Sequence, residues 1–311
     1  MSDGSAPLPR TFAERLRAGR FVMTAEVAPP VSCDAQDLLR KATPLRGLAD
    51  AVNVTDGAGA RAHMAALAAA AILIGMGIEP ILQITCRDKN RIALQSEMMG
   101  AAALGVRNLL LLTGDDPKAG DQPDTKPVFD IDSKTLIETA RRLRDDGTLP
   151  TGRKAAGHAD FFLGAADMPI DPPAGWQPTG LLGKVKSGAQ FVQTQFCMDA
   201  GVVRRYVGVL EQAGVTGQLA LLIGVNPLRS AKSAQWMKSH LYGTIIPDAM
   251  IKRMEGAADP EREGVRICVE LIEEFSTVPG VAGVHIMAPG NDAAIPEVIT
   301  AARSRVRKPA G

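Results

Sequence analysis

Short apolar runs alternate with longer amphipathic or alanine-rich segments along almost the whole chain. Runs of this length, several of them rich in β-branched residues, are typical of strands buried inside a protein. Eight such runs are found, at residues 21–27, 50–56, 79–85, 106–114, 160–166, 189–195, 218–225 and 281–288. Apolar strands that are each followed by a helix predict an all-parallel sheet covered on both faces.

The segments between the strands carry the pattern of helices. We expect helices at residues 34–46, 60–76, 89–104, 133–146, 178–187, 198–213, 228–240, 247–278 and 293–307. The first should begin after Asp34, whose side chain is suited to capping a helix. The long segment 247–278 should break at Asp259-Pro260, because Pro favours the first position of a helix and Asp the position before it.

Eight strands that alternate with helices indicate an α/β fold, a single-domain (β/α)8 TIM barrel over residues 11–308, preceded by a flexible N-terminus at residues 1–10. The alternative, an open doubly wound sheet, usually has a glycine-rich phosphate-binding turn after its first strand. Here the first strand ends in EVAPP, without such a turn. The barrel is therefore favoured, and the active sites of barrels lie at the carboxyl ends of the strands.

Composition and charge argue against several classes of protein. The 311 residues carry a formal net charge of +1 and no long run of Lys or Arg, so no nucleic-acid partner is expected. The four cysteines show no C-x-x-C spacing and histidine is scarce, so neither a disulfide framework nor a metal site is expected. No signal peptide and no membrane-spanning segment is recognisable. These features fit a cytoplasmic protein that acts on a small molecule, and they are compatible with a homo-oligomer.

Two carboxylates follow strands at the predicted mouth of the barrel. Glu26 ends the first strand, and Asp115 follows Gly114 directly after the most apolar strand. A carboxyl group that is partly removed from water favours its protonated form, which suits general acid catalysis. The alternatives are a solvated or salt-bridged strand-end carboxylate for Glu26 and a turn or helix-capping residue for Asp115.

Other polar residues allow both a functional and a structural interpretation. Gln193 and Gln195 share one face of their strand, where two amides could bind a heterocycle or form a polar layer inside the barrel. Lys184 is either a phosphate ligand or a surface lysine, and His285 is either a catalytic residue or a satisfied core histidine. The loop 114–132 is long and rich in Pro, Gly and Asp, as functional lids often are.

Six segments in this order resemble methylenetetrahydrofolate reductases, over about residues 12–305. They are AEVAPP, NVTDGAGAR, ITCRDKNR, LLLTGDDP, KVKSGAQFVQTQ and PGVAGVHIM. Members of this family reduce 5,10-methylenetetrahydrofolate to 5-methyltetrahydrofolate, with a flavin, usually FAD, that takes hydride from NADH or NADPH. The resemblance implies that this chain catalyses the same reaction. The reverse reaction, in one-carbon catabolism, stays an open alternative.

The resemblance also implies roles for individual residues. Glu26 matches the acid that protonates the folate nitrogen as the methylene bridge opens. Asp115 matches the family's Asp beside the flavin and the pterin, and Gln195 matches a residue that binds the folate. The further matches to the flavin site are Thr55, Ala58, Gly114 and Lys184, the last near the phosphates.

Several positions depart from the family pattern. Thr113 stands where well-studied bacterial members have Arg, Gln83 where they have His, and Asp56 where they have Tyr. These three, together with Ala166 at the end of the fifth strand, complete the expected cofactor site. Ala231 replaces an aromatic residue that stacks on the folate. Two alternatives therefore stay open: a folate-binding barrel or electron-accepting subunit that lacks tightly bound flavin and needs a partner, and a barrel with unrelated carbon–carbon or transfer chemistry.

Overall fold

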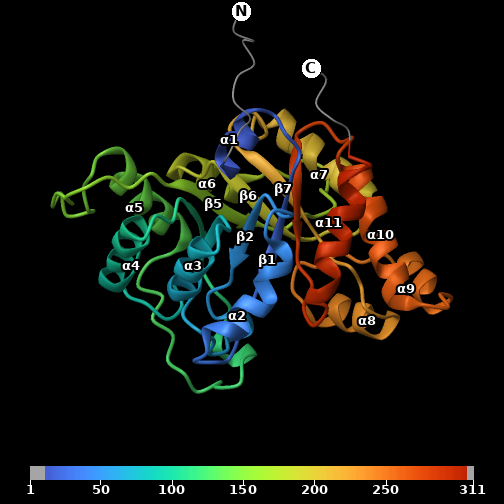
Figure 1. Cartoon of the computed structure of the whole chain (residues 1–311). Coiled ribbons are helices and arrows are strands. Elements are labelled where there is room, and N and C mark those ends of the chain that lie inside the picture. The colour runs from blue at the N-terminus through green and yellow to red at the C-terminus, as the bar shows by residue number, and fades with distance from the viewer. Residues whose placement is uncertain (1–10, 307–311) are drawn as a thin grey trace, which may run out of the picture.

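The strands of this chain close into a barrel. The computed structural model describes residues 11–306, in which eight parallel strands pair in chain order and the last pairs with the first (Figure 1). The strands are β1 (Val22–Val27), β2 (Ala51–Val54), β3 (Pro80–Thr85), β4 (Asn108–Leu112), β5 (Phe162–Asp167), β6 (Phe191–Phe196), β7 (Ala220–Val225) and β8 (Val281–Ile286). The predicted single-domain (β/α)8 barrel is confirmed, and every predicted strand agrees with the observed one to within two residues. The expected flexible segment, residues 1–10, lies outside the described residues.

Helices surround the barrel on its outer side (Figure 1). The α-helices are α1 (Phe12–Arg17), α2 (Ala35–Ala42), α3 (Ala66–Gly75), α4 (Arg91–Ala103), α5 (Ser133–Asp145), α6 (Thr179–Ser187), α7 (Ala200–Gln212), α8 (Ala231–His240), α9 (Asp248–Glu255), α10 (Pro260–Phe275) and α11 (Ile295–Arg303). Short 3-10 helices are η1 (Thr43–Leu45), η2 (Ala58–Ala60), η3 (Pro117–Ala119) and η4 (Asp292–Ala294). Within residues 11–306, none of these helices has the length and apolar character needed to cross a membrane.

The helix boundaries follow the local signals with one clear exception. The break at Asp259-Pro260 is confirmed, because α9 ends before it and the Asp259 side chain caps α10. The segment 60–76, in contrast, becomes helical only from Ala66. Gly57 has a positive φ angle and leads the chain into η2, and the residues after η2 are not helical. The other predicted helix ends differ from the observed ones by four residues or fewer.

Helix α1 is absent from the predicted elements, although its sequence carries a short signal. Thr11 and Glu14 form a capping box, in which each side chain accepts the backbone N–H of the other, at 3.2 and 2.9 Å. The helix inserts Phe12 into the bottom of the barrel, where its ring packs edge-on against Phe162 and Phe191 with centroids 5.9 and 5.3 Å apart. Helix α1 therefore closes the end of the barrel opposite the mouth.

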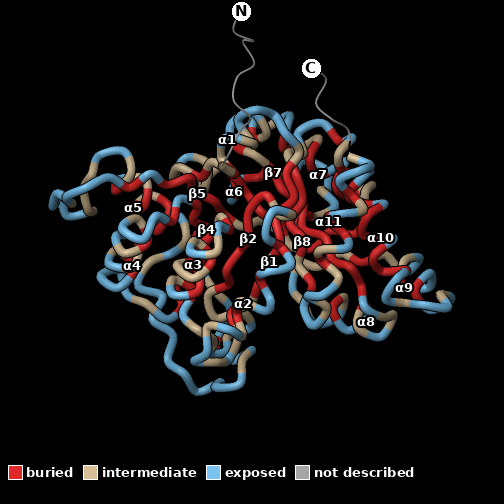
Figure 2. Tube along the Cα trace, viewed as in Figure 1, coloured by how far each residue is buried: buried red, intermediate tan, exposed pale blue. Residues whose placement is uncertain are grey.

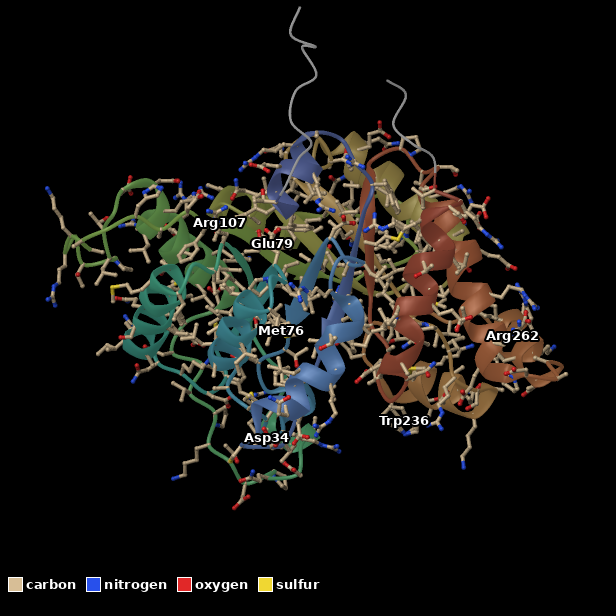
Figure 3. All side chains as sticks on the ribbon, viewed as in Figure 1. Asp34, Met76, Glu79, Arg107, Trp236 and Arg262 are labelled. Atoms are coloured by element: carbon tan, nitrogen blue, oxygen red, sulfur yellow. The ribbon has the colours of Figure 1, made fainter. Side chains whose placement is uncertain are left out.

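Glu79 holds α1 at this closed end. Its carboxylate accepts the backbone N–H of Phe12 at 2.9 Å and the side-chain amide of Asn108 at 2.8 Å. Figure 3 shows Glu79 close to α1, at the end of the barrel from which the chain termini emerge. Burial raises the pKa of Glu79, although the two hydrogen bonds favour the charged form and act in the opposite direction. One carboxyl group thus joins α1 to β3 and β4.

The interior of the barrel is layered, because alternate residues of each strand point inward. The bottom layer is apolar and consists of Phe12, Val22, Ala51, Ile81, Leu110, Phe162, Phe191 and Leu222. The next layer is polar and buried, and consists of Thr24, Asn53, Gln83, Gln193 and His285. Figure 2 shows the strands as the buried centre of the molecule. Hydrogen-bonding groups therefore lie directly beneath the mouth of the barrel.

The first and last helices are joined through one buried carboxylate. Asp50, just before β2, pairs with Arg15 of α1 and with Arg303 of α11, the latter at 2.9 Å. The same carboxylate accepts the backbone N–H of Met23 in β1 at 2.7 Å. Asp50 thus connects three elements that are far apart in the sequence.

Candidate active site

The predicted site residues gather around one cavity at the mouth of the barrel, with a volume of about 550 Å³. Its lining includes all of Glu26, Thr55, Asp56, Ala58, Gln83, Thr113, Gly114, Asp115, Ala166, Lys184 and Gln195. It also includes residues outside the predicted set, among them Arg87, Asp167, Met168, Tyr242 and His285. From the proposed lid 114–132, only Gly114 and Asp115 line the cavity. The structure brings the predicted residues together, and the role of each stays a prediction.

Glu26 lies at the carboxyl end of β1 with its side chain largely buried. Its Oε2 atom is 3.5 Å from Nε2 of His285 and 3.4 Å from the amide nitrogen of Gln83. Within residues 11–306, it pairs with no Lys or Arg. The neighbours of this carboxyl group are thus an imidazole and an amide.

His285 connects Glu26 to the polar layer of the barrel. Its Nδ1 atom is 3.0 Å from Oγ1 of Thr24, which accepts a hydrogen bond from the amide of Gln193 at 3.0 Å. Gln193 also exchanges two hydrogen bonds with Asn53, at 2.6 and 3.0 Å. His285 is thus a satisfied buried histidine, as one interpretation of the sequence had it. It also lines the cavity and contacts the candidate acid, which the pattern within β8 alone does not reveal.

The two glutamines of β6 have different surroundings. Gln193 belongs to the buried polar layer, which is one of the two roles that the sequence allows for it. Gln195 lies two residues further along β6, toward the mouth, where its amide nitrogen is 3.4 Å from the carbonyl of Tyr242 and its oxygen accepts the N–H of Phe196 at 3.0 Å. Of the two, Gln195 is the amide nearer the mouth and better placed to contact a bound molecule.

The end of β2 contributes one unpaired hydroxyl and one paired carboxylate. Oγ1 of Thr55 is buried and has no hydrogen-bond partner within the described residues. Asp56 accepts from the N–H and hydroxyl of Thr85 at 2.9 and 3.0 Å and from Nζ of Lys89 at 2.8 Å. Although burial opposes a charged ammonium, Asp56 and Glu97 raise the pKa of Lys89. Asp56 is therefore bound largely by the protein, whereas Thr55 has an oxygen that a ligand could satisfy.

The loop after β4 packs closely against Arg87. Gly114 has a φ angle of +96°, and a Cβ atom there would lie 2.9 Å from Cβ of Arg87, so this turn requires glycine. The buried guanidinium of Arg87 donates to Asp88 at 2.7 and 2.8 Å. Its hydrogen bonds with Asp88 raise the pKa of Arg87, and the charge of Asp115 acts in the same direction. A cation therefore lies near Asp115 even though Thr113 does not provide one.

Lys184 reaches the edge of the cavity from α6. Its Nζ atom donates to the carbonyl of Ala166 at 2.5 Å and lies 3.8 Å from Oδ1 of Asp167. The other oxygen of Asp167 accepts a hydrogen bond from the buried hydroxyl of Tyr206. Lys184 is therefore partly buried and brings a positive charge to the site, unlike a fully solvated surface lysine.

Tyr242 and Met168 form the outer rim of the cavity. Tyr242 is 84% exposed and Met168 is 40% exposed, yet both line the cavity. Ala231, which the resemblance matches to the family's aromatic residue, is the first residue of α8 and is not part of the cavity lining. The connection between α8 and α9 therefore presents an aromatic ring at the mouth, although it does not follow a strand of the barrel.

The fold and the site together define a class of protein, a (β/α)8 barrel with a cavity at its mouth that is lined by polar and apolar residues. The sequence pattern of the family described as methylenetetrahydrofolate reductase matches residues 11–303. This chain therefore belongs to the methylenetetrahydrofolate reductase family.

Curated relatives carry the same description. A probable methylenetetrahydrofolate reductase (NADPH) of Caenorhabditis elegans is 23% identical over 244 residues, which cover 74% of this chain and 33% of the relative. A 5,10-methylenetetrahydrofolate reductase of Pectobacterium carotovorum subsp. carotovorum is 25% identical over 218 residues, which cover 67% of this chain and 64% of the relative. The chain thus spans a third of the first relative and less than two thirds of the second.

Solved structures share the fold. An uncharacterized protein from Clostridium thermocellum that binds two copies of 5-methyl-5,6,7,8-tetrahydrofolic acid has a TM-score of 0.63 at 14% identity, covering 94% of this chain and 97% of its own. An F420-dependent secondary alcohol dehydrogenase has a TM-score of 0.58 at 13% identity, covering 91% of this chain and 99% of its own. At these identities the likeness shows the barrel fold alone.

Proposed function

We propose that this chain is a cytoplasmic enzyme that reduces 5,10-methylenetetrahydrofolate to 5-methyltetrahydrofolate with NADH or NADPH through bound FAD. The position of Glu26 carries the proposal: a carboxyl group that pairs with no Lys or Arg of residues 11–306 lies in the cavity of a chain that matches the reductase family over residues 11–303. The same site would catalyse the reverse reaction in one-carbon catabolism.

The reaction needs a proton at one atom of the substrate and a hydride at another. The methylene bridge opens to an iminium ion when the leaving nitrogen is protonated, and Glu26 donates this proton from Oε2, which lies between His285 and Gln83. The negative charge of Asp115 stabilises the iminium cation, and the amide of Gln195 binds the folate. One proton and one hydride, the latter ultimately from NAD(P)H, convert the methylene bridge into a methyl group.

The residues around the cavity fit a flavin. The buried hydroxyl of Thr55 has no partner within residues 11–306 and is free to bond a ligand atom. Lys184 supplies a partly buried positive charge suited to a phosphate, and Ala58 and Gly114 supply backbone groups at the cavity wall. FAD, when bound, carries hydride from NAD(P)H to the folate.

The pairing of the cations favours a second candidate, a folate-binding barrel or electron-accepting subunit that lacks tightly bound flavin and needs a partner. Arg87 donates to Asp88, and Lys184 donates to the carbonyl of Ala166. Within the described part of the chain, every Lys and Arg that lines the cavity therefore already has a partner. A phosphate would have to compete with these contacts.

We expect the purified protein to oxidise NADH or NADPH in proportion to the 5,10-methylenetetrahydrofolate supplied, and to do so faster after reconstitution with FAD. The rate follows from nicotinamide absorbance, and flavin retention from visible absorbance after gel filtration.

Lys184→Gln should weaken FAD retention about tenfold, because it removes a charge-assisted contact. Lys186→Gln, an exposed position on the same helix, is the matched control and should have no effect. Activity in protein that stays colourless with excess FAD would reject the flavin, and folate binding without nicotinamide oxidation would favour the second candidate.

We expect Tyr242→Ala to raise the KM for the folate roughly three- to tenfold with little change in kcat, because stacking of an aromatic ring contributes about 0.5–1.5 kcal/mol. The reason is the exposed ring of Tyr242 at the rim of the cavity. Tyr242→Phe keeps the ring and should retain the original KM. Steady-state kinetics of both variants measure KM and kcat, and an unchanged KM in Tyr242→Ala would contradict the stacking role.

A further inference from the structure

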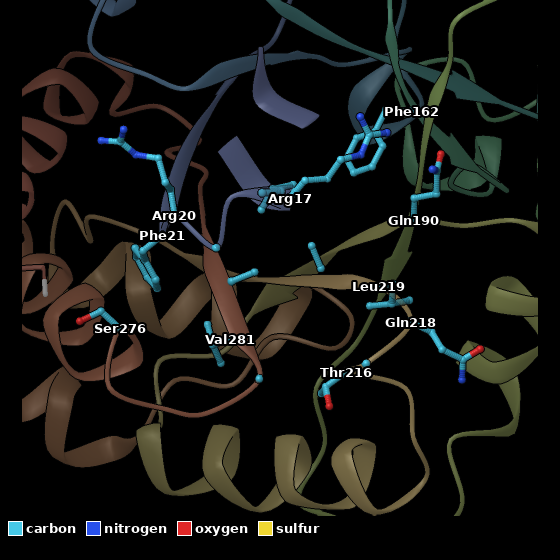
Figure 4. A pocket seen from close by; sticks show the side chains of 16 residues that line it. Arg17, Arg20, Phe21, Phe162, Gln190, Thr216, Gln218, Leu219, Ser276 and Val281 are labelled. Atoms are coloured by element: carbon cyan, nitrogen blue, oxygen red, sulfur yellow. The ribbon is translucent and has the colours of Figure 1, made fainter. Parts of the chain in front are cut away.

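A second cavity, of about 640 Å³, opens at the closed end of the barrel, opposite the mouth. It lies between the end of α1 and the beginnings of β5 to β8 (Figure 4). Helix α1 covers the bore with Phe12 but leaves this space beside it, because the chain turns away at Gly19 toward β1. A cavity of this size is within the range of sites that bind small molecules.

The lining of this second cavity is positively charged. Among the described residues that line it are Arg17 and Arg20 and no Asp or Glu. Within residues 11–306, neither arginine forms an ion pair or a side-chain hydrogen bond, whereas Arg15 of the same helix pairs with Asp50. Figure 4 shows the two arginine side chains on different sides of the cavity. Two guanidinium groups that form no ion pair within residues 11–306 favour an anion.

The rest of the lining combines apolar surface with a few polar groups. Phe21, Leu219 and Val281 are partly or fully buried apolar residues, and the guanidinium of Arg17 lies 5.5 Å from the centre of the Phe162 ring. The oxygen of Gln190 already accepts from the protein, so its amide N–H groups are the part available to a ligand. An anion that carries an apolar, ring-containing body would match both parts of the lining.

We propose that this cavity is a second ligand site, separate from the catalytic mouth, for a small organic anion: a ring-bearing molecule with one carboxylate, phosphate or sulfonate group. One of the two arginines, Arg17 or Arg20, binds the anionic group, and Phe21, Leu219 and Val281 contact the apolar body. The site belongs to the N-terminal face of the barrel and does not depend on the reaction proposed for the mouth.

The probe for this site is 1-anilinonaphthalene-8-sulfonate, a ring-bearing sulfonate whose fluorescence rises when it leaves water. The wild-type protein should bind it at one saturable site. The double variant Arg17→Gln/Arg20→Gln should weaken binding about tenfold or more, because neither guanidinium group remains to bind the sulfonate. Both positions are exposed and unpaired, so circular dichroism and thermal unfolding should show an unchanged fold.

Two matched variants locate the binding. Arg153→Gln removes an exposed arginine elsewhere on the surface, and Lys184→Gln removes a cation at the mouth; both should bind the sulfonate as the wild type does. The uncharged N-phenyl-1-naphthylamine should lose no affinity in the double variant, because it lacks the anionic group. Equal affinity of wild type and double variant for the sulfonate, or a loss of affinity in Lys184→Gln instead, would overturn the proposal.

Discussion

Glu26→Gln is expected to lower the rate of folate reduction about a hundredfold or more. Gln keeps the shape and hydrogen-bonding capacity of the side chain but removes the proton that a general acid must donate. The contacts of Oε2 with His285 and Gln83 place the carboxyl group in the cavity, where it pairs with no Lys or Arg of residues 11–306. Stopped-flow measurement of the folate half-reaction, and of nicotinamide oxidation with an artificial acceptor, separates the two steps.

Only the folate step should be affected, because reduction by NAD(P)H does not require the acid. Asp115→Asn should be milder than Glu26→Gln, since it changes a charge without removing the proton donor. Glu255→Gln, at an exposed position on α9, controls for the loss of a carboxylate as such. Equal losses in both half-reactions of well-folded Glu26→Gln, or near-normal folate reduction, would return Glu26 to the role of a strand-end carboxylate.

Phe12→Ala is expected to lower the free energy of unfolding by about 3–5 kcal/mol, the range for removing a large aromatic side chain from a core. Phe12 is fully buried and packs edge-on against Phe162 and Phe191 at the bottom of the barrel. Little can fill the space, because the rings of Phe162 and Phe191 are already stacked on each other at 5.1 Å. Urea unfolding monitored by circular dichroism measures the change.

The control for Phe12→Ala is an aromatic truncation at an exposed position. Tyr242→Ala should change the free energy of unfolding by less than about 0.5 kcal/mol, because its ring is largely in water. Phe12→Leu, which refills part of the space, should lie between the two. If Phe12→Ala is as stable as the wild type, α1 is only an appendage on the barrel and not part of its core.

The strands could be predicted from the sequence because a buried strand has a local signature. Each run of apolar residues between polar turns is visible without any knowledge of its neighbours, and the eight runs matched the eight strands. The position of the site followed from the same fact, since the carboxyl ends of parallel strands meet at one mouth. Glu26, Asp115 and Gln195 could be named as neighbours although 89 positions separate Glu26 from Asp115 and 80 separate Asp115 from Gln195.

What the sequence did not reveal depends on contacts between distant segments. His285 contacts Glu26 only because β8 pairs with β1, and nothing within β8 distinguishes a histidine in the core from one in a site. Tyr242 comes from a connection between two helices, where no strand end draws attention to it. The first helix has a local signal in the capping box of Thr11 and Glu14, but its six residues are too few to show the repeating pattern that predicts a helix.

The contacts of Asp50 bear on the order in which the chain assembles. Arg303 is 253 positions away from Asp50 in the sequence, and β1 pairs with β8 across a similar separation. While the chain emerges from the ribosome, Arg15 is available to Asp50 early, but Arg303 arrives only after all eight strands have been made. Closure of the ring is therefore a late and slow event, because contacts between such distant segments form against a large loop-closure entropy. Until then β1 exposes an unpaired edge, so the nascent chain is most vulnerable to aggregation at the strand that carries Glu26.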